Sequence, residues 1–309
     1  MALFPLKPFE NIPFINFMAW RRFWIWSSVA CVLATFVLLA KPGLNFGIDF
    51  VGGKLVQVQT TNPVPVASVR QAVDDAGFVG ANIQEFENGR EFLVRLSASD
   101  AKAAAEGSEK IVVDTLAPLG GGAELRRVEF VGPQVGAELA RDGVLALLVS
   151  MLGILMYVSA RFEFRYGLGA ILALLHDVTL TIGLLVLVRL EISLTVLAAI
   201  LTLIGYSLND TIVVYDRVRE MRAKYPNKTL VEVLNISVNS MLARTFMTGM
   251  TTLFVLAVLY LFGGPVLEGF AFTLLFGVVI GTYSSVFVAS PLLLVLEEYY
   301  KTTDKITKV

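Results

Sequence analysis

The alternation of apolar and polar segments along the chain predicts six membrane-spanning helices and one polar domain. Apolar stretches cover residues 23–40, 143–158, 167–188, 192–215, 245–262 and 270–296. Stretches of about 18 or more apolar residues are long enough to cross a bilayer as a helix, and we expect the ends of its helix to lengthen the short second stretch. The first stretch exceeds the roughly 7–15-residue core of a signal peptide, which predicts an anchor that is retained. Residues 143–296 are therefore expected to form spans two to six.

The polar region 41–142 has the pattern of an α/β domain. Residues 54–60, 82–87, 91–97 and 124–131 read as strands, and residues 65–76 and 99–116 have helical spacing. Asn88-Gly89 is a strong signal for a two-residue hairpin turn, and Ser99 is a candidate N-cap of the second helix. The order βαββαβ predicts a ferredoxin-like domain.

Composition supports a membrane protein and argues against several other classes. Of the 309 residues, 56% are hydrophobic and 17% are charged, and the mean hydropathy is +0.71. No basic patch alternates with aromatic residues, so nucleic acid is not an expected partner, whereas membrane lipids are. The single cysteine, Cys31, allows no internal disulfide. The sequence has no GxxxxGK(S/T) loop, no HExxH motif and one histidine, so we expect no nucleotide hydrolysis, no metal site and no cofactor.

The distribution of basic residues predicts the orientation of the spans, because cytoplasmic loops carry an excess of lysine and arginine. With the N-terminus inside, the cytoplasmic segments hold 14 basic residues and the two short outer turns hold only Arg189. Both termini are then cytoplasmic, with an interfacial leader at residues 1–22 and a tail at residues 297–309. Region 41–142 is then expected on the outer side of the membrane, in a multi-pass membrane protein.

Five polar residues lie in or beside the predicted spans, namely His176, Asp177, Asn209, Asp210 and Arg244. An ionisable group at the bilayer centre costs about 2.5–3.5 kcal/mol on insertion scales, so it normally faces a partner or a water-filled cavity. Asp210 and Arg244 are expected to meet at similar depth, as a titrating pair, if spans four and five pack together. The plainer alternative is that Arg244 snorkels and Asp210 caps a helix end. His176 and Asp177 point about 100° apart on a helix and are not expected to face one site equally.

Small residues in span six indicate close helix packing. Gly277 and Gly281 form a GxxxG pattern, and small faces let helix backbones approach in lipid. Ordinary packing is one explanation of this pattern. The alternative is a sliding interface, or contact with a second chain that covers the membrane surface of the bundle.

Several longer motifs resemble the SecF family of protein-export membrane proteins, which belongs to the RND superfamily. The matching motifs are NFGIDF at 45–50 with Gly52-Gly53, VGPQVG at 131–136, HDV at 176–178, GYSLNDTIVVYDRVRE at 205–220, Arg244-Thr245 and GTYSS at 281–285. They are spread from the first span to the sixth, which makes the resemblance specific. Lys54 stands where the family often has threonine, a local departure at the start of a strand.

The resemblance implies half of a twelve-helix unit, in which six spans and one periplasmic domain pair with SecD beside the SecYEG channel. It also implies that proton or sodium flow drives late steps in the export of unfolded polypeptide, with no enzyme activity. Asp210 and Arg244 match the family positions linked to the ion path, and Asn209, Asp177 and His176 are candidate neighbours in that relay.

The segment that joins the outer domain to span two is expected to act as a hinge, with Gly132, Pro133 and Gly136 as its candidate residues. Re-packing of spans four and five could tilt the domain through this segment.

Three other functions remain open at this point. A drug or lipid exporter of the same superfamily usually carries larger outer domains and both six-span halves in one chain. An intramembrane aspartyl protease would use Asp177, Asp210 or Asp216, but the GxGD motif of that class is absent. The third alternative is a purely structural scaffold for SecD.

Overall fold

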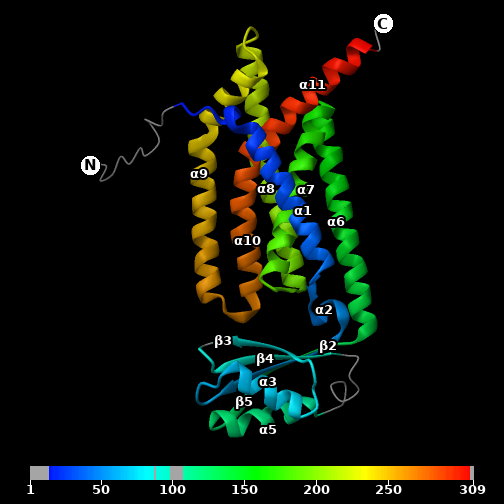
Figure 1. Cartoon of the computed structure of the whole chain (residues 1–309), viewed down its shortest axis with the longest axis vertical. Coiled ribbons are helices and arrows are strands. Elements are labelled where there is room, and N and C mark those ends of the chain that lie inside the picture. Colours follow the sequence, from blue (N-terminus) through cyan, green and yellow to red (C-terminus); the bar gives the residue numbers. More distant parts are fainter. Residues whose placement is uncertain (1–13, 87, 98–106, 307–309) are drawn as a thin grey trace, which may run out of the picture. The chain divides into compact units, whose positions relative to one another are not determined.

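The protein divides into two compact units, which are described separately (Figure 1). The computed structural model describes residues 14–86, 88–97 and 107–306. The sheet unit comprises Asn45–Leu147 together with Glu191–Leu194. The helical unit comprises Met1–Leu44, Leu148–Leu190 and Thr195–Val309.

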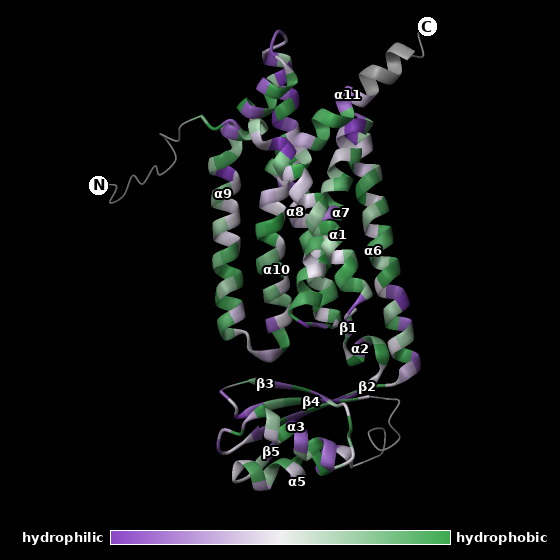
Figure 2. Ribbon diagram, in the orientation of Figure 1, coloured by the Kyte–Doolittle hydropathy of each residue, from purple (hydrophilic) through white to green (hydrophobic). Residues whose placement is uncertain are grey.

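Six helical segments in the described residues are long and apolar enough to cross a membrane, which confirms the predicted number of spans. Their elements are η1 (Phe17–Trp20) with α1 (Arg21–Ala40), α6 (Pro133–Arg161), α7 (Phe164–Leu187), α8 (Leu194–Lys224), α9 (Leu230–Phe262), and α10 (Gly264–Ser284) continued by η2 (Ser285–Ala289) and α11 (Ser290–Ile306). Figure 2 shows their largely hydrophobic composition. The short second stretch is lengthened, as expected, because α6 begins at Pro133.

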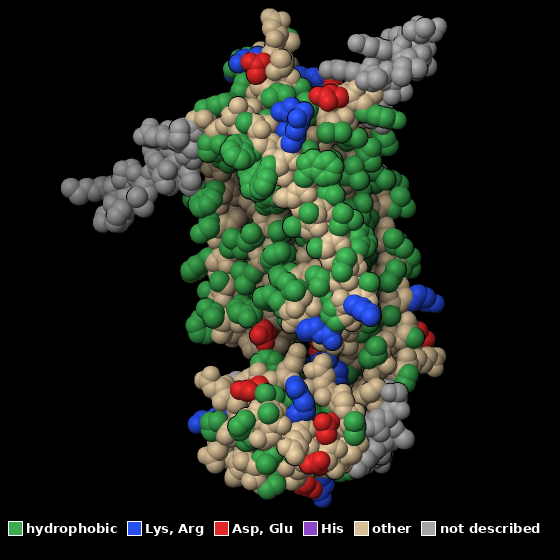
Figure 3. Space-filling view, in the orientation of Figure 1, with side chains coloured by type: hydrophobic (Ala, Val, Ile, Leu, Met, Phe, Trp, Pro, Cys, Tyr) green, Lys and Arg blue, Asp and Glu red, His purple; other side chains and the backbone are tan. Residues whose placement is uncertain are grey.

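The spans differ in how deeply their own chain buries them. Half of the most apolar window is buried in α7 and in α8, and 61% is buried in the last span. The corresponding values are 6% for α6 and 17% for α9. The helices α7, α8 and α10 therefore supply the core, whereas α6 and α9 present apolar surface (Figure 3).

The sheet unit confirms the predicted ferredoxin-like order. Strands β2 (Gly53–Thr60), β3 (Asn82–Phe86), β4 (Glu91–Ser97) and β5 (Ala123–Val131) form an antiparallel sheet in the order β3-β4-β2-β5. Helices α3 (Val66–Asp75) and α5 (Ser108–Gly120) share one hydrophobic core with the sheet, and Val56, Phe92 and Leu116 are among its buried side chains.

The hairpin between β3 and β4 turns at Asn88 and Gly89, where both residues have positive φ angles of 55° and 82°. Such angles suit the two-residue turn that the sequence predicted. The helix expected at 99–116 corresponds to α5, which extends further, to Gly120. The expected N-cap Ser99 lies outside the described residues.

Three short elements of the sheet unit were not predicted. These are β1 (Asn45–Phe46), α2 (Ile48–Val51) and β6 (Glu191–Ile192). β1 pairs in parallel with β6, matching Asn45 to Glu191 and Phe46 to Ile192. The expected tight turn between spans three and four is thus also a strand of the sheet unit. The sheet unit therefore extends beyond the expected boundaries of 41–142. The sequence did not predict this extension, because pairing between segments so distant in sequence leaves no periodic signal.

Candidate functional site

Asp210 is a buried carboxylate in the middle of a long helix. Its residue is 4% exposed, and among the described residues its Oδ2 atom has no hydrogen-bond partner. α8 continues to Lys224, so the alternative that Asp210 caps a helix end is wrong. The preceding residue, Asn209, is exposed. Because a buried polar atom is normally hydrogen-bonded, the free oxygen of Asp210 marks a candidate functional position.

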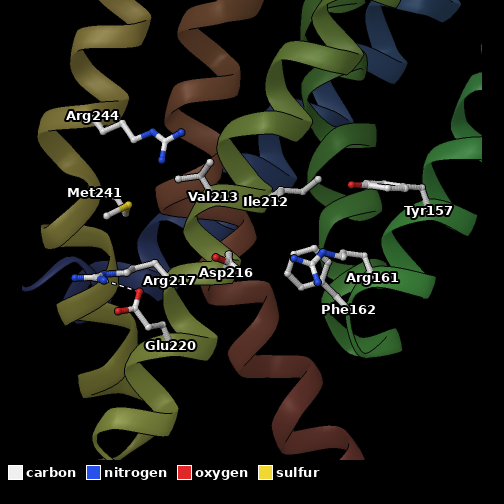
Figure 4. A pocket seen from close by; sticks show the side chains of 10 residues that line it. All are labelled: Tyr157, Arg161, Phe162, Ile212, Val213, Asp216, Arg217, Glu220, Met241 and Arg244. Carbon is white, nitrogen blue, oxygen red and sulfur yellow. Dashed lines mark hydrogen bonds and ion pairs between the residues drawn. The ribbon is translucent and has the colours of Figure 1, made fainter.

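Arg244 lies on α9 and lines a pocket of about 390 Å³ (Figure 4). The pocket is lined by Tyr157, Arg161, Phe162, Ile212, Val213, Asp216, Arg217, Glu220, Met241 and Arg244. Arg217 pairs with Glu220 at 2.5 Å and donates to Ser240 Oγ at 3.0 Å. Figure 4 shows Arg244 reaching from α9 toward α8. The pocket therefore gathers charged side chains beside the helix that carries Asp210.

Asp210 and Arg244 were expected to meet as a pair, but in this structure their side chains are not in direct contact. The two side chains interact electrostatically, but no ion pair within 4.0 Å joins them among the described residues. The exposed position of Arg244 agrees with a side chain that reaches toward polar surroundings. The Asp210 carboxylate therefore lies inside the bundle, and the Arg244 guanidinium lies at the surface of the bundle.

His176 and Asp177 form one buried network, contrary to the expectation that they would not face the same site. His176 Nδ1 lies 2.8 Å from Asp177 Oδ1. Asp177 Oδ2 accepts hydrogen bonds from Ser207 Oγ at 2.5 Å and from Ser284 Oγ at 2.6 Å. The two oxygens of the Asp177 carboxylate thus have different partners. Asp177 of α7 thus connects α8 and α10.

Gly277 and Gly281 lie where α10 crosses α8 within the same chain. A Cβ atom at Gly277 would come within 2.7 Å of Leu203 Cδ1, and one at Gly281 within 3.1 Å of Ser207 Cβ. Both glycines are buried. They therefore allow α8 and α10 to pack closely inside the bundle, and they do not form a surface that is open to a second chain.

The candidate hinge residues lie at a tightly packed junction of the sheet unit. A Cβ at Gly136 would lie 3.0 Å from the backbone nitrogen of Gly52, and one at Gly52 would lie 2.9 Å from Pro133 Cα. Gly52 also has a φ angle of 75°, which favours glycine. Gly132 precedes this junction and has no close neighbour. The hinge role of this segment stays a prediction.

Sequence reasoning missed a set of contacts around β6. Arg95 of β4 forms a buried ion pair with Glu191, and the N–H of Leu194, the first residue of α8, donates to Asp49 Oδ2 at 2.8 Å. Gly47 leaves no room for a side chain beside Glu191. Burial lowers the pKa of Arg95 to about 10, and the nearby Asp49 carboxylate opposes part of this change. Asp49 and Gly47 both lie in the NFGIDF motif, and this motif was the one sequence signal that could have indicated these contacts.

A second missed set anchors the end of the last span. Glu297, which was read only as a boundary, is 3% exposed and pairs with Arg165 at 2.7 Å and Arg222 at 2.8 Å. The described residues contain no group of three histidine, cysteine, aspartate or glutamate side chains that could hold a metal ion.

Comparison with known proteins identifies the family. The family model described as "Protein export membrane protein SecD/SecF, C-terminal" matches residues 111–299, and that of the "SecD/SecF GG Motif" matches residues 37–64. The chain belongs to the SecD/SecF family. Within this family it is 46% identical to "Protein translocase subunit SecF" of Magnetococcus marinus, over 94% of this chain and 95% of the relative. It is 42% identical to the protein of that name from Escherichia coli O157:H7, over 91% of this chain and 87% of the relative.

A SecD/SecF structure also shares the fold. The crystal structure of SecDF from Thermus thermophilus matches 93% of this chain with a TM-score of 0.82 and 35% identity. The match covers 39% of the SecDF chain, so this chain spans well under half of that protein. A second SecDF structure, in a form called super-membrane-facing, matches 96% of this chain and 40% of the other with a TM-score of 0.72 and 34% identity.

Proposed function

We propose that this chain is the SecF subunit of a SecD–SecF complex that uses a proton or sodium gradient to promote polypeptide export across the bacterial inner membrane. The complex acts beside the SecYEG channel, on unfolded polypeptide, with both termini of this chain in the cytoplasm. Support comes from the family, from relatives named SecF, and from a SecDF structure whose chain contains this fold as one part.

The observation that carries the ion-coupling role is the buried Asp210 with its unpartnered oxygen. A carboxylate in the middle of a spanning helix is costly unless it serves a pathway or a partner. One elementary charge that crosses about 100 mV releases about 2.3 kcal/mol, enough to bias a two-state equilibrium nearly a hundredfold. Arginine stays charged at all working pH values, which leaves Asp210 as the group that changes state. The chemistry is therefore reversible ion uptake and not bond cleavage.

Coupling to the sheet unit can follow the chain itself. α8 carries Asp210, and its first residue, Leu194, is held by Asp49. Just before it, Glu191 is paired with Arg95 and β6 with β1. A movement of α8 on ion uptake would act on these contacts directly.

The test is gradient-driven export in inverted membrane vesicles that contain this chain and SecD at normal levels. Asp210→Asn holds the site neutral, so we expect an assembled complex without gradient-driven export. Asp210→Glu should keep part of the activity because it retains a titratable carboxylate. Arg244→Lys should lose more export activity than a conservative substitution usually does, because lysine lacks the planar guanidinium.

Asp142→Asn is the matched control, because it neutralises an exposed aspartate that pairs with Arg141, which is also exposed. We expect wild-type export from this variant. Wild-type export by Asp210→Asn would instead refute the ion-coupling role.

A further inference from the structure

Two hydroxyl groups near Asp210 share its unusual state. The Oη atom of Tyr206 and the Oγ1 atom of Thr282 are buried and, within the described part of the chain, have no hydrogen bond of ordinary geometry, although the Tyr206 hydroxyl interacts with the hydroxyls of Thr252 and Thr282. Neither is explained by the resemblance or by the helix packing described above. Buried oxygens without a well-formed hydrogen bond are unusual, because such groups are normally satisfied.

The three oxygens lie in one region between α8, α9 and α10. Tyr206 and Asp210 are four residues apart on α8 and therefore share a helix face. A Cβ atom at Gly249 of α9 would lie 3.5 Å from Thr282 Oγ1 and 4.0 Å from Tyr206 Oη, so both hydroxyls border the same space over this glycine. The Tyr206 hydroxyl also interacts electrostatically with Asp210.

Apolar packing closes one side of this region. Tyr206 packs against a buried cluster made of Ala199, Leu203, Leu256, Leu274 and Val278. Asp210 interacts electrostatically with the Tyr206 hydroxyl and with Arg244 of α9. The nearest carboxylate on α7, Asp177, is already occupied by Ser207 and Ser284. The free oxygen of Asp210 and the loosely bonded hydroxyls of Tyr206 and Thr282 therefore remain available to a ligand.

The donor set defines the ligand chemistry. One carboxylate and two hydroxyls form an all-oxygen set, which suits a hard cation and offers no nitrogen or sulfur ligand. Hydroxyls can also hold water, because each accepts and donates a hydrogen bond. We propose that Asp210, Tyr206 and Thr282 together bind the coupling cation, either sodium or a proton carried on water, and that the two hydroxyls set its affinity. This inference rests on the proposed ion-coupling function and adds two ligands to it.

The experiment measures gradient-driven export in vesicles with the full chain and SecD, in two series. One varies sodium chloride against choline chloride at fixed pH, and the other varies pH at fixed sodium. Tyr206→Phe and Thr282→Val each remove one hydroxyl at nearly constant volume. We expect each to raise the half-maximal concentration of sodium or of protons by roughly tenfold, the ratio given by one lost hydrogen bond to a charged group. The maximal export rate at saturating ion should be retained.

The coupling ion is identified by the series, sodium or pH, in which the half-maximal concentration changes. Thr282→Ser keeps the hydroxyl and should behave as wild type. Thr273→Val is the matched control on the same helix, because the Thr273 hydroxyl already donates to the carbonyl of Gly269 at 2.7 Å. Gly249→Ala places a methyl group against both hydroxyls without removing either, and should raise the half-maximal concentration by a smaller factor. This variant also serves if Thr282→Val does not assemble.

The two proposals fail in different ways. If Asp210→Asn is inactive but both hydroxyl variants keep the wild-type half-maximal concentration in both series, the cation site is wrong and the coupling function stands. If Asp210→Asn exports normally, the coupling function itself is wrong. Sodium-dependent thermal stabilisation of the purified complex gives a second readout, which Tyr206→Phe should weaken if sodium is the ligand.

Discussion

Two buried aspartates in neighbouring spans have opposite surroundings. Asp177 on α7 is fully buried, and its two oxygens are engaged by His176, Ser207 and Ser284. Asp210 on α8 is nearly as buried, yet one of its oxygens has no partner within the described residues. Both carry the same chemical group at a similar cost of burial. The difference lies in whether the protein itself satisfies that group.

This difference separates a structural from a functional carboxylate. Hydrogen bonds to both oxygens of a buried carboxylate make the packing around it specific, although the Nε2 atom of His176 in this network has no partner within the described residues. An oxygen left free inside the bundle contributes nothing to packing, and it remains available to an ion that arrives and leaves. Ser207 links the two sites, because it binds Asp177 and lies three residues before Asp210 on α8. Asp177 therefore holds in place the helix that carries Asp210.

The largest expected effect on stability is at Asp177. Asp177→Ala removes the carboxylate partner of Ser207, Ser284 and His176; Ser284 keeps the carbonyl of Gly281 as an acceptor, whereas a buried group left unsatisfied costs about 1–3 kcal/mol. We therefore expect Asp177→Ala to lower the thermal unfolding midpoint of the detergent-purified complex strongly. Asp210→Asn should leave the midpoint nearly unchanged while it abolishes export. Equal stability losses in the two variants would remove the distinction drawn between the two aspartates.

A buried ion pair outside the bundle provides a second test of the same idea. Removing one partner of a buried pair costs about 3–5 kcal/mol, whereas replacing both with apolar residues costs far less. Arg95→Met alone should therefore destabilise the protein more than the double variant Arg95→Met with Glu191→Leu. A chemical unfolding series on the full chain measures both. A double variant less stable than Arg95→Met would show that the pair itself, and not an isolated charge, governs stability.

The pH dependence of this pair has a defined sign. Burial lowers the pKa of Arg95 in the folded state to about 10, below its ordinary value in the unfolded chain. Between these values the unfolded state binds more protons than the folded state, so the contribution of Arg95 to stability rises with pH. Below about pH 10 the contribution is constant. The stability difference between wild type and Arg95→Met should therefore be flat from pH 6 to 9 and change only above that range.

The smallest expected effect is at Glu297, a buried carboxylate that pairs with two arginines. Its partners Arg165 and Arg222 have side chains that are 30% and 42% exposed, so water screens the interaction. We expect Glu297→Gln to cost about 1–2 kcal/mol, less than the loss at Asp177. High salt should reduce the difference between wild type and variant. A cost independent of salt would point to packing instead.

Local patterns determined much of this fold. The six spans follow from stretches of apolar residues, and the strand order follows from alternation and from the Asn88-Gly89 turn, because each of these signals lies within a few neighbouring residues. The importance of Asp210 was also readable, since a carboxylate within an apolar stretch is conspicuous without any structure. The same was true of His176 and Asp177 as candidates, although not of their arrangement.

Tertiary structure decided which of these groups are satisfied. Asp177 and Asp210 look equivalent in sequence, and only the packing of α7, α8 and α10 assigns Ser207 and Ser284 to one of them. The grouping of the Tyr206 and Thr282 hydroxyls is likewise invisible in a linear pattern, because it depends on helices that meet across 76 residues of chain (206 to 282). The pairing of β1 with β6 has the same origin. Periodicity reports the face that a residue occupies, whereas hydrogen-bond partners are set by side chains brought together from distant segments.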